Sequence, residues 1–260
     1  MTLQSRLDRY TSRGFSQEDA EILVLIEEAA SGLFAAFADR FILVGGATLV
    51  LFYESRRVSR DLDLLPTADE LPASDELQAV VDRNIQPLAD VLGFGKLAYN
   101  QNGNGTAFLK LWIKSGDRVL FSIDVTRIGG AVLKSEIVQE AIAGNTGTTI
   151  FTPSTNFLLL QKCETFLERR HIKARDAFDI DVLLLKGAKL GEVLLAHLDD
   201  FIQMRELDAH LIQSRIASVN AKLCTAELRP VLPDELFGRL AKNDFRQLRD
   251  SLASAFKNWI

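Results

Sequence analysis

Two aspartates, Asp61 and Asp63, stand two positions apart in a run of leucines, and this run most constrains the fold. On a β-strand, side chains two positions apart point to the same face, so both carboxylates are expected to aim at one point. Two carboxylates that close repel each other unless a cation lies between them or one is protonated. Oxygen ligands in this spacing suit Mg²⁺, which commonly takes a few carboxylates together with substrate phosphates. The run therefore predicts metal-assisted phosphoryl or nucleotidyl transfer.

Composition sets outer limits on the class of protein. Of the 260 residues, 47% are hydrophobic and 25% are charged, which is ordinary for a soluble globular protein of one large or two smaller domains. The net charge of −5 argues against a wholly electrostatic nucleic-acid binder but leaves room for a local basic patch. The N-terminus lacks the apolar segment of a signal peptide, and no apolar run approaches the roughly 20 residues that cross a bilayer. Cys163 and Cys224 lack metal-ligand spacing, so we expect reduced core thiols in a cytoplasmic protein with no membrane contact.

Hydrophobic spacing and turn residues predict an α/β (α+β) fold, in which a mixed-sheet domain is followed by a helical domain. Helices are expected at 16–39, 47–54 and 74–92, and strands at 41–44, 61–65, 94–98, 107–113, 119–125 and 148–151. The segments 100–105 and 115–117 are rich in Gly, Asn and Asp and are expected to be turns. After Pro153 the periodicity becomes helical and glycine is scarce. We therefore expect domains at 1–152 and 153–260.

A glycine pair, Gly45-Gly46, ends the expected strand 41–44 and precedes a helix. Glycine lets a backbone approach a phosphate closely, and a helix N-terminus offers free N–H groups to an anion. Taken alone, the pair is typical of a plain tight turn. Together with the acidic pair on what is expected to be an adjacent strand, it predicts one site, where the glycine loop binds phosphates and the carboxylates hold the metal that bridges them.

The acidic pair also has structural interpretations. It could lie solvated on a surface strand, or it could pair with the arginines just upstream (Arg56, Arg57 and Arg60). A further carboxylate, Asp124, alternates with apolar residues, where burial is costly unless the group is paired or metal-bound. If its strand neighbours the strand of Asp61, Asp124 supplies a third carboxylate and holds the ion that activates the attacking hydroxyl in a two-metal transfer. Otherwise it is a polar, outward strand position.

The second domain carries four basic residues and a phenylalanine that are expected on one helical face, by steps of three and four residues: Lys162, Phe166, Arg169, Arg170 and Lys173. Such a face is usually solvated. Opposite a metal–triphosphate site it would instead bind phosphates, with Lys162 acting as a point charge. Asp176 and Asp179 share a face of the next helix and are expected either to pair with the nearby arginines or to orient Lys162 and position the acceptor.

Taken together, these motifs resemble the AbiEii-type nucleotidyltransferase toxins, a branch of the DNA-polymerase-beta-like nucleotidyltransferase superfamily. The matching positions are 44–49, 57–64, Asp124, 161–164 and 173–180, and their combination is specific. The resemblance implies a nucleotidyltransferase fold and an enzyme that uses an NTP with Mg²⁺ or Mn²⁺. It also implies a cytoplasmic toxin of a toxin–antitoxin or phage-defence system, with a cognate antitoxin protein. For several relatives the acceptor is the 3′ end of tRNA, and its modification blocks aminoacylation.

Position by position, the resemblance implies that Asp61, Asp63 and Asp124 are metal ligands, that Lys162 binds the triphosphate, and that Asp176 is the acid of a fourth motif. The NTP site that the motifs predict comprises Gly45, Gly46, Thr48, Lys162 and Arg169. The chain departs from the superfamily after the glycines. Where Ser or Thr is common, it has Ala47 with Thr48 next, so either the Thr48 hydroxyl or backbone N–H groups contact phosphate.

Two other functions remain open from the sequence. The same chemistry could act on a hydroxyl of a protein or of a small molecule such as an aminoglycoside, or the chain could be a non-catalytic nucleotide- or RNA-binding module that keeps the fold. The intact aspartates argue against the module, because an unused carboxylate cluster costs desolvation and repulsion. A hydrolase is disfavoured because the histidines form no HD or HExxH pattern (His171, His197 and His210).

Overall fold

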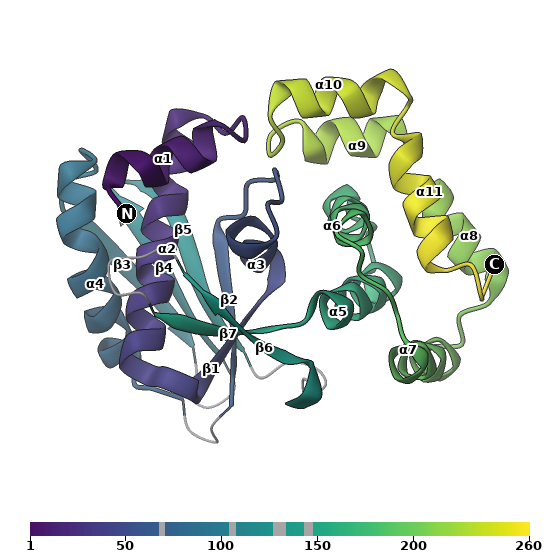
Figure 1. Ribbon diagram of the computed structural model, residues 1–260, viewed down its shortest axis with the longest axis horizontal. Coiled ribbons are helices and arrows are strands. Elements are labelled where there is room, and N and C mark those ends of the chain that lie inside the picture. The colour runs from purple at the N-terminus through teal and green to yellow at the C-terminus, as the bar shows by residue number, and fades with distance from the viewer. Residues whose placement is uncertain (68–70, 104–107, 127–133, 143–147) are drawn as a thin grey trace. The chain divides into compact units, whose positions relative to one another are not determined.

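The computed structural model describes residues 1–67, 71–103, 108–126, 134–142 and 148–260. Its contacts divide the chain into two compact units, Met1–Pro153 and Ser154–Ile260. The described strands lie in the first unit, and the described elements of the second are helices (Figure 1). No helix in the described part of the chain combines the length and the apolar character that a bilayer crossing needs.

The first unit is built on a five-stranded sheet with the order β1-β2-β5-β4-β3. The strands are β1 (Phe41–Val44), β2 (Asp61–Pro66), β3 (Leu97–Gly103), β4 (Phe108–Ser115) and β5 (Arg118–Thr126). The pair β2–β5 is parallel and the other pairs are antiparallel. A hairpin of β6 (Ile137–Ala141) and β7 (Thr149–Pro153) forms a second sheet. This arrangement confirms the predicted mixed-sheet α/β fold.

Helices cover one face of the large sheet. The helices of this unit are α1 (Leu3–Thr11), α2 (Gln17–Phe37), α3 (Gly45–Phe52) and α4 (Ser74–Val91), with short 3₁₀ turns at Ala38–Arg40 and Lys134–Glu136. Long helices α2 and α4 lie beside each other against the sheet (Figure 1). Ser16 caps α2 by accepting a hydrogen bond from the N–H of Asp19. One core joins α2, α4 and the helix-facing side chains of the strands.

Some local predictions for this unit are wrong. Asn100–Gly103 belong to β3 and not to a turn, because they pair along their length with β4, and this ladder outweighs their local turn preference. Asn104, Gly105 and Ala107, which were expected in the turn and in the next strand, lie outside the described residues. Helix α3 begins at Gly45, two residues before its predicted start, and α1 and β6 were not predicted.

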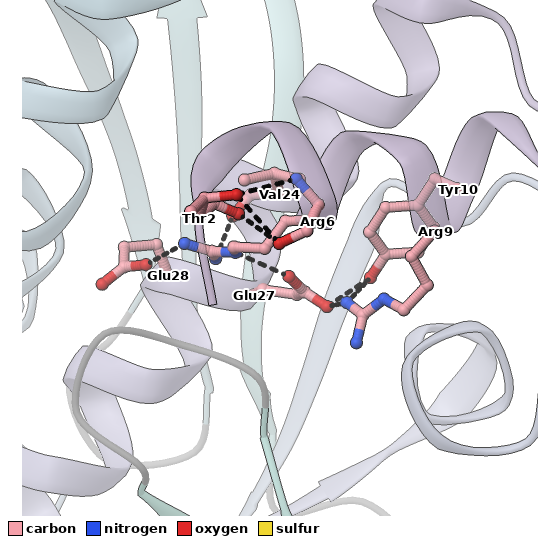
Figure 2. Close-up of polar contacts among 8 residues, drawn as sticks. Thr2, Arg6, Arg9, Tyr10, Val24, Glu27 and Glu28 are labelled. Carbon is pink, nitrogen blue, oxygen red and sulfur yellow. Dashed lines mark hydrogen bonds and ion pairs between the residues drawn. The ribbon is translucent and has the colours of Figure 1, made fainter.

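A cluster of buried charges joins α1 to α2 (Figure 2). Glu27 on α2 accepts hydrogen bonds from Arg6 Nε at 3.2 Å and from the Tyr10 hydroxyl at 2.6 Å, and it also pairs with Arg9. Arg6 Nη1 reaches Glu28 at 2.7 Å. Burial raises the pKa of Tyr10 to about 12, so its hydroxyl remains a donor at neutral pH. Because a buried charge without its partner is costly, the cluster fixes how α1 lies on α2.

The segment between α3 and β2 is held by the N-terminal part of the chain. The guanidinium of Arg13 donates to the carbonyl of Ser55, and Arg56 Nε donates to the carbonyl of Arg13 at 2.7 Å. Arg60 pairs with Asp19 of α2 at 2.8 Å. These contacts direct the chain into β2. From the sequence, Arg60 could also have paired with Asp61 or Asp63. In the structure it pairs with Asp19 instead.

The second unit consists of α5 (Thr155–Glu168), α6 (Ala174–Leu185), α7 (Glu192–Met204), α8 (Ala209–Ala217), α9 (Ala221–Leu228), α10 (Asp234–Lys242) and α11 (Arg246–Ala255). Helix α6 packs against α5, α9 and α11. Cys163 and Cys224 are buried free thiols, as predicted. The predicted single basic face from Lys162 to Lys173 is wrong, because α5 ends at Glu168, and Phe166 is a core residue stacked on Phe256.

Candidate active site

The three aspartates singled out in the sequence lie on one face of two adjacent strands. In the parallel pair β2–β5, Asp63 is directly opposite Asp124, and Asp61 is opposite Ser122. Leu62 and Leu64 are buried in the core with α2 and α4, so the aspartates point to the other face of the sheet. We call Asp61, Asp63 and Asp124 the acidic row. The sequence-based site requires that the strand of Asp61 lies next to the strand of Asp124, and in the structure β2 pairs with β5.

Neighbouring side chains contact the acidic row at both ends. Ser122 donates its hydroxyl to Asp61 at 2.8 Å, and Lys110 on β4 pairs with Asp124 Oδ2 at 2.7 Å. The other oxygen of Asp124, Oδ1, is buried and has no hydrogen-bond partner within the described part of the chain. A buried carboxylate oxygen without a donor is costly, and such groups often mark the place of an ion.

Among the residues that the structure describes, no three His, Cys, Asp or Glu side chains come close enough together to hold a metal ion. The donors of the acidic row nevertheless fit Mg²⁺ or Mn²⁺, because they are carboxylate oxygens on one face and one of those oxygens lacks a partner. Lys110 supplies the compensating positive charge that Asp124 otherwise needs.

The glycine turn lies directly against the acidic row. Gly45 has a φ of +78°, which favours glycine, and a Cβ atom there would lie 2.9 Å from Cγ of Asp63 and closer still to its Oδ2. At Gly46, a Cβ atom would lie 2.5 Å from Nη2 of Arg57 and 2.6 Å from Oγ of Ser59. Gly45 therefore requires glycine, whereas a larger residue at position 46 would force the side chains of Arg57 and Ser59 to shift. The sequence reasoning did not assign Arg57 and Ser59 to this turn, although they alternate by two with the acidic pair.

Helix α3 starts at the glycine turn, so its first N–H groups, which have no partner inside a helix, lie beside the acidic row. A helix N-terminus of this kind attracts anions such as phosphate. Thr48 is fully buried in α3, and its hydroxyl has no hydrogen-bond partner among the described residues. Of the two alternatives for phosphate contact, this burial favours backbone N–H groups over the Thr48 hydroxyl.

Within the second unit, two buried acids hold the two predicted phosphate-binding cations. Lys162 Nζ lies 2.7 Å from Oδ2 of Asp179, and Arg169 Nε lies 2.6 Å from Oδ2 of Asp176. Both acidic side chains are at most 2% exposed, whereas the side chains of Lys162 and Arg169 are 14% and 37% exposed. Charged groups so held have restricted rotamers, which is what a preformed anion site needs.

A mixed sheet with a glycine turn against an acidic strand and a third carboxylate on the neighbouring strand defines the protein as a nucleotidyltransferase by class. The chain matches the family described as "Nucleotidyl transferase AbiEii toxin, Type IV TA system" over residues 31–259, and it belongs to that family. The family and the enzyme class predicted from the sequence are therefore confirmed.

Two solved structures from Helicobacter pylori share the fold. A candidate nucleotidyltransferase is 16% identical, with 94% of this chain and 97% of that chain covered and a TM-score of 0.53. The protein JHP933 is 14% identical, with 94% of each chain covered and a TM-score of 0.54. At these identities the likeness concerns the fold alone. No match was found among curated proteins.

Proposed function

We propose that this protein transfers a nucleotidyl group from an NTP to the 3′-terminal hydroxyl of a tRNA, with Mg²⁺ or Mn²⁺ held by Asp61, Asp63 and Asp124. The observation that carries the proposal is the contact of Gly45 with Asp63, which stands directly opposite Asp124. The same face of the sheet thus has a glycine turn that can bind phosphate and carboxylates that can bind a bridging ion. We assign 1–152 as the catalytic domain and 153–260 as the helical domain.

Different residues of the site bind the phosphates, hold the ion and face the attacking hydroxyl. In the first unit, the N–H groups at the start of α3 bind phosphates of the NTP. The sequence motifs also assign Lys162 and Arg169 to the triphosphate. A bound divalent ion would neutralise the carboxylates and polarise the attacking hydroxyl. Asp124 lies one strand further from the glycine turn than Asp63. We propose that the attacking hydroxyl enters on that side. The hydroxyl oxygen forms a bond to the α-phosphorus and gives its proton to the Asp124 carboxylate, from which it passes to solvent. The α–β phosphoanhydride bond breaks, and pyrophosphate leaves towards α3.

The consequence of this reaction suits a toxin. Aminoacylation requires the 3′-terminal hydroxyl of tRNA, so a tRNA that carries an added nucleotide cannot be charged, and translation stops. The family is described as part of a type IV toxin–antitoxin system, which supports a cognate antitoxin that opposes this effect. We propose that the protein acts in the cytoplasm, where its NTP and tRNA substrates are found.

The test is incubation of the full chain with each of the four α-labelled NTPs, Mg²⁺ and total tRNA. Label should appear on tRNA, and Asp63→Ala should abolish transfer while leaving the free energy of unfolding unchanged or raised, because a repelling carboxylate is removed. Asp117→Asn, at an exposed position in the turn between β4 and β5, is the matched control and should keep full activity.

Two outcomes would reject parts of the proposal. Label that appears only on protein would reject the RNA acceptor and favour transfer to a protein hydroxyl. Transfer by Asp63→Ala at the wild-type rate would reject the metal role of the acidic row.

A further inference from the structure

The sheet face that carries the acidic row continues across β4 with an aromatic ring between two lysines. Leu111 and Ile113 of β4 are buried in the core, so the alternating side chains of Lys110, Trp112 and Lys114 point to the opposite face. The register places Lys110 opposite Asp124 and Trp112 opposite Ser122, so these side chains share the face of the acidic row.

The edge strand β3 extends the same face with two amides. Tyr99 donates to Asp82 at 2.8 Å and Gln101 donates to Gln78 at 2.5 Å, and both partners lie on α4, so these two side chains point to the helices. Asn100 and Asn102 therefore point to the other face. Asn100 is opposite Trp112, and Asn102 is opposite Lys110. We call this surface the β3–β4 platform, formed by Asn100, Asn102, Lys110, Trp112 and Lys114.

The platform has the shape and chemistry of a site for an unpaired nucleotide. A shallow hollow of about 630 Å³ is lined by Trp112, Lys114, Asn100 and Val119, among others. Lys110 Nζ lies 5.5 Å from the centre of the Trp112 ring. Lys114 Nζ lies 2.9 Å from the Asn100 amide oxygen when that amide is oriented to satisfy both of its ends. An aromatic face for base stacking beside flexible cations for phosphates is how proteins bind single strands.

The order of the strands separates the donor from the acceptor. The glycine turn follows β1, the acidic row lies on β2 and β5, and the platform lies on β4 and β3. In phosphoryl-group transfer the attacking and leaving oxygens lie roughly in line on opposite sides of phosphorus. If the pyrophosphate leaves at the glycine turn, the acceptor must enter from the platform side, where β4 is about 5 Å from β5.

We propose that the β3–β4 platform binds the acceptor strand, with an unpaired base next to the reacting 3′ end stacked on Trp112 and its phosphates near Lys114. The site rests on the proposed nucleotidyl transfer to RNA and names the form of RNA that it requires, an unpaired 3′ end. The positive charge of Lys114 complements a phosphodiester, and the platform adjoins the acidic row without a break.

The chain offers a direct probe, because Trp112 and Trp259 are its two tryptophans. In the Trp259→Phe chain the fluorescence comes from Trp112 alone. An unpaired RNA of about eight nucleotides with a free 3′ hydroxyl, added without NTP or metal, should quench this fluorescence to saturation. A blunt RNA duplex and an NTP alone should quench it much less. Binding is read without catalysis, so the result is separate from the test of transfer.

Kinetics supply the second measurement. Trp112→Ala should weaken binding of the labelled RNA and raise the KM for tRNA about 5- to 150-fold, with little change in the KM for NTP. Trp112→Phe should restore most of the affinity, and Lys114→Gln should weaken binding and lower its salt dependence. Trp259→Phe is the matched control and should behave as the wild type.

Three results would overturn the proposal that the β3–β4 platform binds the acceptor strand. These are transfer to tRNA that persists with no quenching of Trp112, quenching by NTP as strong as that by RNA, and a KM for tRNA unchanged in both Trp112→Ala and Lys114→Gln. If label goes only to protein while unpaired RNA still quenches Trp112, the proposed function fails and RNA binding by the platform stands.

Discussion

Gly45→Ala tests the contact on which the active site depends. Gly45 has a φ of +78°, and a Cβ atom there would lie inside 3 Å of the Asp63 carboxylate. Non-bonded carbon atoms approach each other only to about 3.5–4.0 Å, so the methyl group and the carboxylate cannot both stay in place. The change therefore has two effects: it strains the backbone, and it displaces Asp63 from the acidic row.

Gly93→Ala separates the two effects. Gly93 has a φ of +81°, and a Cβ atom there would meet no heavy atom within 4 Å among the described residues. Both variants should lose about 1–2 kcal/mol of unfolding free energy, because an alanine in the left-handed region is strained. Only Gly45→Ala should also slow transfer, by about 100-fold, since a catalytic group displaced by about 1 Å costs that much in rate.

The assay measures stability and turnover on the same samples. Urea unfolding followed through Trp112, in chains that carry Trp259→Phe, gives the free energy of the first unit. Single-turnover transfer of labelled nucleotide, expressed per folded molecule, gives the rate. The reasoning is refuted if Gly45→Ala transfers as fast as Gly93→Ala, since the contact between the turn and Asp63 would then have no bearing on the chemistry.

Three further outcomes are expected, with stability measured by unfolding through the tryptophan of the unit concerned and the KM for NTP measured by the transfer assay. Glu27→Gln should destabilise the first unit by about 1.5–3 kcal/mol, because the buried Arg6 keeps only Glu28 as a carboxylate partner and the half-buried Arg9 loses its ion pair, whereas the exposed Glu76→Gln on α4 should have little effect. Lys162→Met should raise the KM for NTP about tenfold or more and destabilise the second unit; adding Asp179→Asn should restore stability but not the KM. Burial raises the pKa of Asp181 despite two hydrogen bonds that lower it, so the folded state holds its proton more tightly than the unfolded chain. The unfolding free energy of the second unit should therefore fall as pH rises through that pKa, and Asp181→Asn should make this slope less steep.

Local alternation was enough to place the acidic pair from the sequence. Strand β2 spans Asp61–Pro66, one residue longer than predicted, and its leucines at 62 and 64 are at most 1% exposed. A period of two needs no knowledge of distant residues, because neighbouring side chains on a strand always point to opposite faces. The direction of both carboxylates could therefore be predicted, and so could the position of Gly45 at the end of β1.

Contacts between distant segments could not be predicted in the same way. The sequence of residues 120–125 does not indicate that Asp124 lies opposite Asp63, because that register depends on the packing of the whole sheet. The end of α5 is a second example. Residues 162–173 have good helix propensity, yet Arg215 from α8 donates to the carbonyls of Phe166 and Arg169 and so satisfies the helix end. A cap supplied 46 residues away leaves no local signal.

The alternation that builds the core also fixes the direction of the acidic row. If β2 slipped by one residue, Asp61 and Asp63 would enter the core and Leu62 and Leu64 would leave it. Each leucine would lose about 1.5–3 kcal/mol of burial, and each buried carboxylate would cost several kcal/mol more. The strand is also held on both sides, by β1 and by β5, so a slip would break two ladders. Because the core excludes this slip, the acidic row keeps its geometry without contributing to the core, and changes to its carboxylates can be tested on a protein that still folds.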